Sequence, residues 1–169
     1  SRIIAEKKTA ALFRLGARSA GFLSGIRDQA LLYLDSFGNH LGISFQMLDD
    51  LLDVLSSEEQ LGKRPGTDLR ERKPSLVNLL WLSSNSPLAK KLLVAPNEEE
   101  ENFISEAIAE IISSDIIATA REHAQSEAQA AERALQDAAK QAKSVGIRIN
   151  DEALSAIQYV IKYTVDRMS

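Results

Sequence analysis

The spacing of apolar residues predicts a protein built almost entirely from helices. Between positions 41 and 55 they recur at steps of four and three, which is the period of a helix face packed against other helices. These residues are Leu41, Phe45, Leu48, Leu52 and Leu55. The rest of the chain is rich in Ala, Leu, Glu, Lys and Gln and contains 4 prolines, with little of the alternation that strands show. We therefore expect an all-α fold, a helical bundle.

Capping and breaking signals divide the chain into expected helices. We expect them at 3–15, 28–56, 76–82, 88–94, 104–112, 116–145 and 150–168. Asp28 and Asp115 are candidate N-caps, and Gly146 is a candidate C-terminal stop. The segments 16–25 and 62–74 are rich in small residues or in Gly and Pro, so we expect them to be connections.

Two further expectations concern packing. The alanine-dense stretch 116–145 could form a coiled coil, but its apolar residues are small and irregularly spaced. Such a helix favours close packing against neighbouring helices over an extended oligomer seam. Trp81 and Phe45 are expected in the core.

Composition narrows the class of protein. A chain of 169 residues that is 44% hydrophobic and 26% charged suits one soluble globular domain. The formal net charge is -4, so the chain has no excess of positive charge that would attract nucleic acid or an anionic membrane. The absence of cysteine excludes disulfides and thiolate metal sites. No apolar run approaches the roughly 20 residues of a membrane span, and no secretory segment opens the sequence, so we expect a cytoplasmic protein.

A group of carboxylates interrupts the apolar pattern of the second expected helix. Asp49, Asp50 and Asp53 occupy two consecutive turns, and Gln46 lies one turn earlier on the stripe that holds Asp49 and Asp53. Like charges at this spacing repel, so a positive group is expected nearby. Magnesium is the natural candidate, because it is commonly held by one or two carboxylates together with substrate phosphates. A solvated acidic helix face is the alternative for an isolated motif of this kind.

A basic segment follows the carboxylates directly. Residues 62–73 include Lys63, Lys73 and three arginines. This combination suits a diphosphate, because metal ions bridge phosphate oxygens while lysines neutralise the remaining charge. Without the acidic neighbour, an ordinary charged surface loop would be favoured. His40 and His123 have no partner at metal-ligand spacing, so neither is given a function.

Taken together, these motifs resemble a known family. Residues 45–53 read Phe-Gln-Met-Leu-Asp-Asp-Leu-Leu-Asp, followed by Gly-Lys at 62–63 and Gly-Thr-Asp-Leu at 66–69. This resembles the second aspartate-rich region, FQxxDDxxD then GKxxGxDL, of the trans-isoprenyl diphosphate synthases, the polyprenyl synthetase family. Residues 8–10 resemble the family's KTA segment, and 121–135 and 163–167 resemble its alanine-rich helix and terminal YxxxR. The resemblance implies that 1–169 is the C-terminal portion of a single polyprenyl synthetase domain with the isoprenoid synthase fold.

The resemblance also implies an activity and roles for individual residues. Enzymes of this family condense an allylic prenyl diphosphate with isopentenyl diphosphate, using magnesium held by two aspartate-rich motifs. The cofactor implied here is therefore magnesium. The implied roles are metal binding by Asp49, Asp50 and Asp53, diphosphate binding by Lys8, Lys63 and Lys73, and catalysis by Lys8, Thr9, Gln46 and Lys63.

One departure from the family pattern decides the expected partners. The first aspartate-rich motif and the residues that receive isopentenyl diphosphate should lie upstream of the KTA segment, and the sequence does not contain them. We therefore expect the chain alone to be inactive, and its partners to include the missing N-terminal half of the domain, within a homodimer or a heteromer. The alternative is a noncatalytic subunit of a heteromeric prenyl diphosphate synthase. A terpene cyclase is disfavoured, because the GKxxGxDL loop is the pattern of the elongating enzymes.

Overall fold

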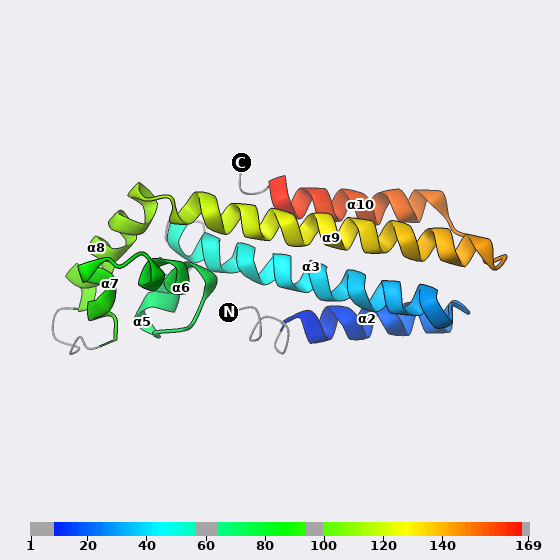
Figure 1. Cartoon of the computed structure of the whole chain (residues 1–169), viewed down its shortest axis with the longest axis horizontal. Helices are drawn as coiled ribbons and strands as arrows, with labels where there is room; N and C mark the ends of the chain where they lie inside the picture. Colours follow the sequence, from blue (N-terminus) through cyan, green and yellow to red (C-terminus); the bar gives the residue numbers. More distant parts are fainter. Residues whose placement is uncertain (1–8, 57–63, 94–99, 167–169) are drawn as a thin grey trace. The chain divides into compact units, whose positions relative to one another are not determined.

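The computed structural model describes residues 9–56, 64–93 and 100–166 (Figure 1). Every regular element in these ranges is a helix, which confirms the all-α fold. The helices are α2 (Ala11–Leu23), α3 (Asp28–Leu55), α5 (Thr67–Arg70), α6 (Leu76–Ser83), α7 (Pro87–Lys91), α8 (Glu100–Ser113), α9 (Ile116–Ser144) and α10 (Asp151–Asp166). None of the helices described combines the length and the apolarity needed to cross a bilayer.

The chain forms two compact units. Residues 2–46 and 123–169 make up one, which we call the bundle unit, and residues 47–122 make up the other, which we call the aspartate unit. The bundle unit contains α2, α10, the first part of α3 and most of α9. The aspartate unit contains α5 to α8 with the end of α3 and the start of α9.

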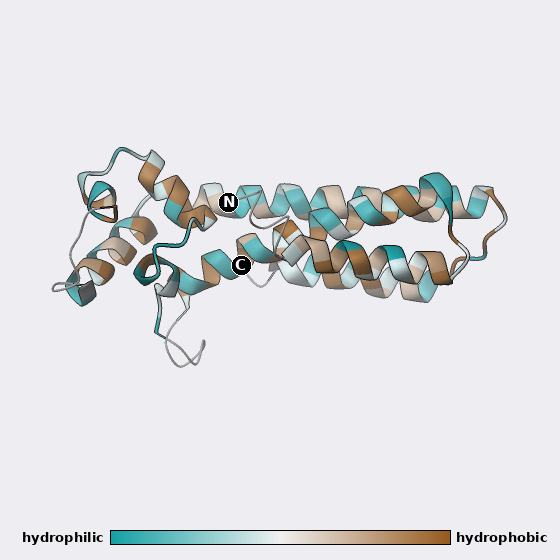
Figure 2. Cartoon of the chain, turned by 90° about the horizontal axis from the view of Figure 1, so that it is seen from below, coloured by the Kyte–Doolittle hydropathy of each residue, from teal (hydrophilic) through white to brown (hydrophobic). Residues whose placement is uncertain are grey.

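Small side chains let the helices of the bundle unit pack closely. Its core cluster joins residues of α3, α9 and α10, with Phe13 and Ala17 of α2 packed against it: Phe37, Leu41, Ala128, Ala131, Ala134, Leu135 and Ile161. In Figure 1, α2 runs beside the first part of α3, and α10 runs beside α9. Hydrophobic and hydrophilic residues alternate along these helices in Figure 2, as expected when one face of a helix is buried. The close packing predicted for the alanine-dense helix is thus confirmed.

Glycines set the approach of α2 to α3. A Cβ atom at Gly38 would lie 2.7 Å from the carbonyl oxygen of Phe13, and one at Gly42 would lie 2.5 Å from the Cα of Ala10. Neither position can therefore carry a side chain while the two helices stay this close. Arg14 of α2 also donates to a carboxylate oxygen of Asp35 on α3 at 2.8 Å.

The prediction that 16–25 is a connection was wrong over most of its length. Helix α2 continues to Leu23, and the turn follows at Gly25, whose φ is 84°. The contacts of α2 with α3 and the core outweigh the low helix propensity of Gly16 and Gly21. Tertiary packing therefore overrides the local signal here.

The ends of the long helices follow their sequence signals. Helix α3 begins at Asp28, and Asp115 directly precedes α9, where its carbonyl oxygen accepts from the Thr119 N–H at 2.9 Å. Gly146, with a φ of 83°, stops α9 as predicted, and Ile147 N–H donates back to the Ala142 oxygen at 3.0 Å.

Polar side chains also occur inside the bundle unit. His40 Nδ1 lies 2.7 Å from Glu127 Oε2, and Ser44 Oγ donates to the carbonyl oxygen of Ala124 at 2.9 Å. These contacts tie α3 to α9. Phe45, which was expected in the core, is 45% exposed, so that prediction was wrong. Its ring lies 5.7 Å from that of Phe13, at the edge of the packed region.

The aspartate unit is built around a buried indole. Trp81 of α6 is fully buried, as predicted, and its Nε1 donates to Glu110 Oε1 at 2.9 Å. The ring of Phe103 lies 6.2 Å away. Other large side chains that are fully buried in this unit come from several elements: Leu51, Leu69, Val77, Ile104 and Ile111. The segment 62–74 was expected to be a connection, but it contains the short helix α5. The start of this helix is held by Asp53, which accepts hydrogen bonds from the N–H groups of Gly66 and Asp68.

Candidate functional site

The three aspartates of α3 lie in different environments within the aspartate unit. Asp49 is exposed, whereas Asp50 and Asp53 are only 6% and 2% exposed. Asp50 and Asp53 are three residues apart and therefore neighbours on one side of the helix. The spacing in the sequence placed Asp49 and Asp53 on one stripe of the helix. In the structure they differ in exposure, because Asp53 is buried and Asp49 is open to solvent.

Asp50 joins α3 to the beginning of α6. Its Oδ2 accepts a hydrogen bond from the Leu76 N–H at 2.7 Å. A carboxylate is favourable there, because the first N–H groups of a helix have no partner within the helix and carry partial positive charge. Ser75 adds the N-cap, since its Oγ accepts from the Asn78 N–H at 3.3 Å.

Asp53 holds the segment around Gly66 through two backbone N–H groups. Its Oδ2 accepts from the Asp68 N–H at 2.9 Å, and its carbonyl oxygen accepts from the Gly66 N–H at 2.7 Å. Gly66 has a left-handed φ of 75°, and a Cβ there would lie 2.9 Å from Ile108 Cδ1. The backbone conformation and the lack of space both require glycine at this position.

Asn78 is a site residue that the sequence reading missed. It is 1% exposed, and its Nδ2 donates to the carbonyl oxygens of Asp68 and Lys73 at 3.0 and 2.9 Å. It thereby closes the turn between α5 and α6. The available signal was a single amide side chain within the apolar run 76–82.

Lys73 of this segment is paired with two carboxylates. Lys73 Nζ lies 2.7 Å from Glu71 Oε2 and 3.2 Å from Asp68 Oδ1. The hydrogen bond to Glu71, more than the contacts with Asp68, raises the pKa of Lys73 above its ordinary value. Its ammonium group is exposed and stays charged at neutral pH.

A second ion-pair group lies nearby. Arg70 and Arg64 both contact Glu101 of α8, at 2.9 and 3.3 Å, and Arg70 also donates to the carbonyl oxygen of Pro65. The hydrogen bond from Arg70 lowers the pKa of Glu101. These surface contacts connect the segment to α8.

Two other predicted residues meet in the bundle unit. Thr9 Oγ1 donates to Gln46 Oε1 at 2.6 Å, although the residues are 37 positions apart. The resemblance had implied a catalytic role for both of them, and the structure brings their side chains together. Lys8 and Lys63 lie outside the described residues.

The donor set can be compared with what a metal requires. The described ranges contain no group of three or more His, Cys, Asp or Glu side chains arranged to hold a metal ion. Magnesium does not need such a cage, because it retains several waters and binds through one or two carboxylates and the phosphates of a substrate. An exposed carboxylate at Asp49 fits this incomplete type of donor set.

Comparisons with known proteins place the chain in a family. Residues 2–114 match the family model "Polyprenyl synthetase". The chain is 31% identical over 163 residues to a geranylgeranyl diphosphate synthase of Saccharolobus solfataricus, covering 95% of this chain and 46% of that protein.

Two solved structures extend the likeness over 98% of the chain. The heptaprenyl diphosphate synthase of Staphylococcus aureus superimposes with a TM-score of 0.81 at 25% identity, over 49% of that chain. The polyprenyl synthase of Caulobacter crescentus, solved with calcium and isoprenyl diphosphate, gives 0.80 at 28% identity over 48% of its length. The chain thus spans about half the length of these relatives. A shorter match of 116 residues, 35% identical, to a dimethylallyltranstransferase of Fischerella ambigua covers 69% of this chain and 34% of that protein. The chain belongs to the polyprenyl synthetase family.

Proposed function

We propose that this chain supplies the second metal and diphosphate half-site of a prenyltransferase that condenses an allylic prenyl diphosphate with isopentenyl diphosphate. Family membership supports isoprenoid chain elongation as the reaction class. The proposal is made for a half-site because the chain covers about half of its relatives. In this proposal, residues 1–169 are one portion of a larger domain.

The observation that carries the proposal is that Asp53 holds the basic segment against α3, the helix that also presents Asp49 to solvent. Asp53 directs a carboxylate oxygen to the Asp68 N–H of the basic segment, and Asp50 directs one to the Leu76 N–H just beyond it, while Asp49 remains open to solvent. A purely structural role for α3 gives no reason for a basic segment tethered to the helix that carries the exposed Asp49. We assign Asp49 the direct contact with magnesium and propose that Asp50 and Asp53 add negative charge to the same site.

The remaining residues are assigned to binding and orientation. Lys73, whose pKa is raised, is proposed to stay cationic and contact diphosphate oxygens together with Lys8 and Lys63. Thr9 and Gln46 are proposed to present a fixed pair of oxygens toward the reacting carbon, because their hydrogen bond holds both side chains in place. Magnesium, when bound, would neutralise charge on the leaving diphosphate.

Binding measurements on the purified chain test the half-site. We expect inorganic pyrophosphate to bind in the presence of magnesium, as measured by calorimetry, and Asp49→Asn to weaken this binding at least about tenfold, which is about 1.4 kcal/mol. Asp137→Asn makes the same chemical change at an exposed position of α9 and should leave binding unchanged. Unchanged binding in Asp49→Asn would show that the half-site is assigned incorrectly.

An activity assay tests the incomplete nature of the site. The chain by itself should form no product from isopentenyl diphosphate and farnesyl or geranylgeranyl diphosphate in magnesium. Steady turnover would contradict the half-site. If magnesium pyrophosphate also fails to bind the native chain, the noncatalytic subunit of a heteromeric synthase becomes the better description.

A further inference from the structure

The turn that ends α5 has an arginine at a position that usually holds glycine. The Arg72 N–H donates to the carbonyl oxygen of Leu69 at 3.1 Å, and the Lys73 N–H donates to that of Asp68 at 2.9 Å. These two backbone hydrogen bonds form a Schellman motif, in which the residue at the place of Arg72 takes a left-handed conformation. Arg72 accordingly has a φ of 50°, which a residue with a Cβ adopts only at an energetic cost.

Its residue type separates Arg72 from the other residues with this backbone conformation. Among the described residues that have a positive φ and are not glycine, the others are Asp28 and Asn85. Aspartate and asparagine enter the left-handed region more easily than other residues, because their short polar side chains can hydrogen-bond to the nearby backbone. The long side chain of arginine does not offer this local compensation.

Contacts on both sides of Arg72 impose the left-handed conformation. Asp53 accepts from the Asp68 N–H, on the α5 side of the turn. The buried Asn78 donates through Nδ2 to the carbonyl oxygens of Asp68 and Lys73. None of these contacts involves the side chain at position 72, where glycine would meet the same backbone requirement without the cost. A residue kept in such a conformation indicates that its side chain has a function.

The charges next to Arg72 indicate what this function is. Lys73 Nζ lies 2.7 Å from a carboxylate oxygen of Glu71 and 3.2 Å from one of Asp68. Because two carboxylates face one ammonium group, Lys73 and these partners together have no excess of positive charge that would attract an anion. Arg72 is exposed and directly precedes Lys73, so it adds a cation at this point of the basic segment.

We propose that Arg72 is a further diphosphate-binding residue, whose guanidinium group donates hydrogen bonds to oxygen atoms of the substrate diphosphate. A guanidinium group suits this role, because its planar fork can donate two parallel hydrogen bonds to one phosphate group. The backbone contacts hold the start of this side chain in place before the anion arrives. This inference rests on the proposed function, since it adds a residue to the same half-site.

Three substitutions at position 72 separate the effect of the charge from that of the backbone. Arg72→Ala removes the guanidinium group and keeps a Cβ, Arg72→Lys keeps both a positive charge and a Cβ, and Arg72→Gly removes both. We expect the Ala and Gly variants to bind inorganic pyrophosphate with magnesium at least about fivefold more weakly than the native chain, as measured by calorimetry, and the Lys variant to lose less. Arg72→Gly should at the same time raise the Tm by about 2 °C, whereas the other two variants should melt like the native chain.

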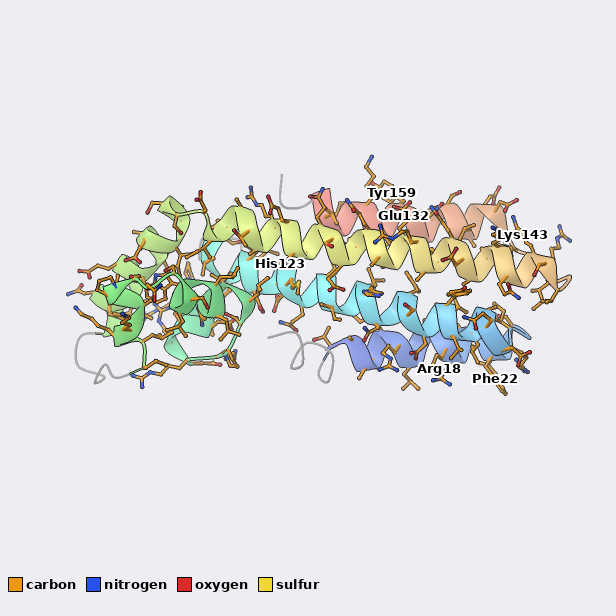
Figure 3. All side chains as sticks on the ribbon, viewed as in Figure 1. Arg18, Phe22, His123, Glu132, Lys143 and Tyr159 are labelled. Carbon is orange, nitrogen blue, oxygen red and sulfur yellow. The ribbon has the colours of Figure 1, made fainter. Side chains whose placement is uncertain are left out.

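Two matched controls complete the test. Arg18→Ala makes the same change at an exposed arginine of α2, which Figure 3 shows projecting from the edge of that helix. Asn85→Gly places glycine at another left-handed position, in the turn between α6 and α7. Both controls should bind magnesium pyrophosphate like the native chain. Native-like binding in Arg72→Ala and Arg72→Gly, or an equal loss of binding in Arg18→Ala, would overturn the role of Arg72.

The role of Arg72 and the proposed function can fail separately. Native-like binding in Arg72→Ala together with weakened binding in Asp49→Asn would overturn the role of Arg72 and leave the half-site intact. Weakened binding in Arg72→Ala together with native-like binding in Asp49→Asn would support the contact of Arg72 with the anion and contradict the magnesium site at Asp49. If the native chain binds no pyrophosphate with or without magnesium, both the role of Arg72 and the half-site are overturned.

Discussion

In the bundle unit, helices meet through glycine and alanine, whereas in the aspartate unit buried carboxylates and an amide hold a folded segment by its backbone. Gly38 and Gly42 leave room for α2, and alanines of α9 fill the core. Asp50, Asp53 and Asn78 instead receive or donate hydrogen bonds across 26, 15 and 10 positions of sequence. The stability of the bundle unit depends on small side chains where helices meet, and that of the aspartate unit depends on buried hydrogen bonds. Added volume should therefore destabilise the first unit most, and loss of a hydrogen-bond acceptor should destabilise the second.

The largest effect is expected where the bundle unit has no space. Gly38→Ala places a Cβ 2.7 Å from the Phe13 oxygen and 2.8 Å from backbone atoms of Arg14, so the helices must separate. We expect the free energy of unfolding to fall by about 3 kcal/mol, as measured by urea denaturation followed by circular dichroism. Gly16→Ala, where no atom lies within 4 Å, should instead stabilise the protein by up to about 1 kcal/mol. If Gly38→Ala and Gly16→Ala changed the free energy of unfolding by similar amounts, the small size of residue 38 would not be what allows α2 and α3 to pack closely.

The next effect tests the polar anchors of the aspartate unit. Asp53→Ala removes the acceptor of the Asp68 N–H and should cost about 2 kcal/mol, because a buried donor loses its partner. Asp53→Asn retains an oxygen acceptor and should cost less than about 1 kcal/mol. Hydrogen exchange at the Asp68 amide, followed by NMR, should accelerate in the alanine variant only. Equal protection in both variants would contradict the anchoring role.

A smaller effect is expected at the start of α6. Ser75→Ala removes the side-chain oxygen that accepts from the Asn78 N–H, and loss of such an N-cap costs about 1 kcal/mol. Thermal unfolding should show the loss, and Ser75→Asp should restore most of it. If the alanine variant melts like the native protein, Asp50 alone is sufficient to hold this helix start.

The smallest effect is expected at the exposed pair of Arg70 and Glu101. The pKa of Glu101 is lowered, so its contribution to stability is present above its ordinary pKa of 4.5 and is lost as the pH falls through the lower value of the folded state. Glu101→Gln should therefore lower the Tm slightly at neutral pH. The Tm of this variant should also decrease less than that of the native protein when the pH is lowered into the acidic range. Glu106→Gln, at another exposed position of α8, serves as the control. An unchanged acid profile in Glu101→Gln would show that the pair contributes nothing measurable.

Local periodicity was sufficient to predict several elements, but not the contacts between distant segments. The expected helices at 76–82 and 150–168 correspond to Leu76–Ser83 and Asp151–Asp166. The helical state of 16–23 was missed, because it depends on packing against α3 rather than on propensity.

The candidate site shows the same limit of sequence reasoning. The resemblance named Thr9 and Gln46 among the site residues without predicting a contact between them, and the structure joins their side chains by a hydrogen bond. The burial of Asp50 and Asp53 was not readable, because it arises where a later segment folds back over α3. Helix periodicity reports which residues share a face; it carries no information about which segment will cover that face.

The contacts of Asp53 bear on how much sequence change the basic segment can accept. Both of its acceptors engage main-chain N–H groups, at Gly66 and Asp68, rather than side chains. The backbone at Gly66 and Asp68 is therefore held by contacts that do not involve the side chains at 71–73. A library that randomises those positions while retaining Gly66 should yield folded variants with altered anion preference, which makes this segment a practical starting point for engineering.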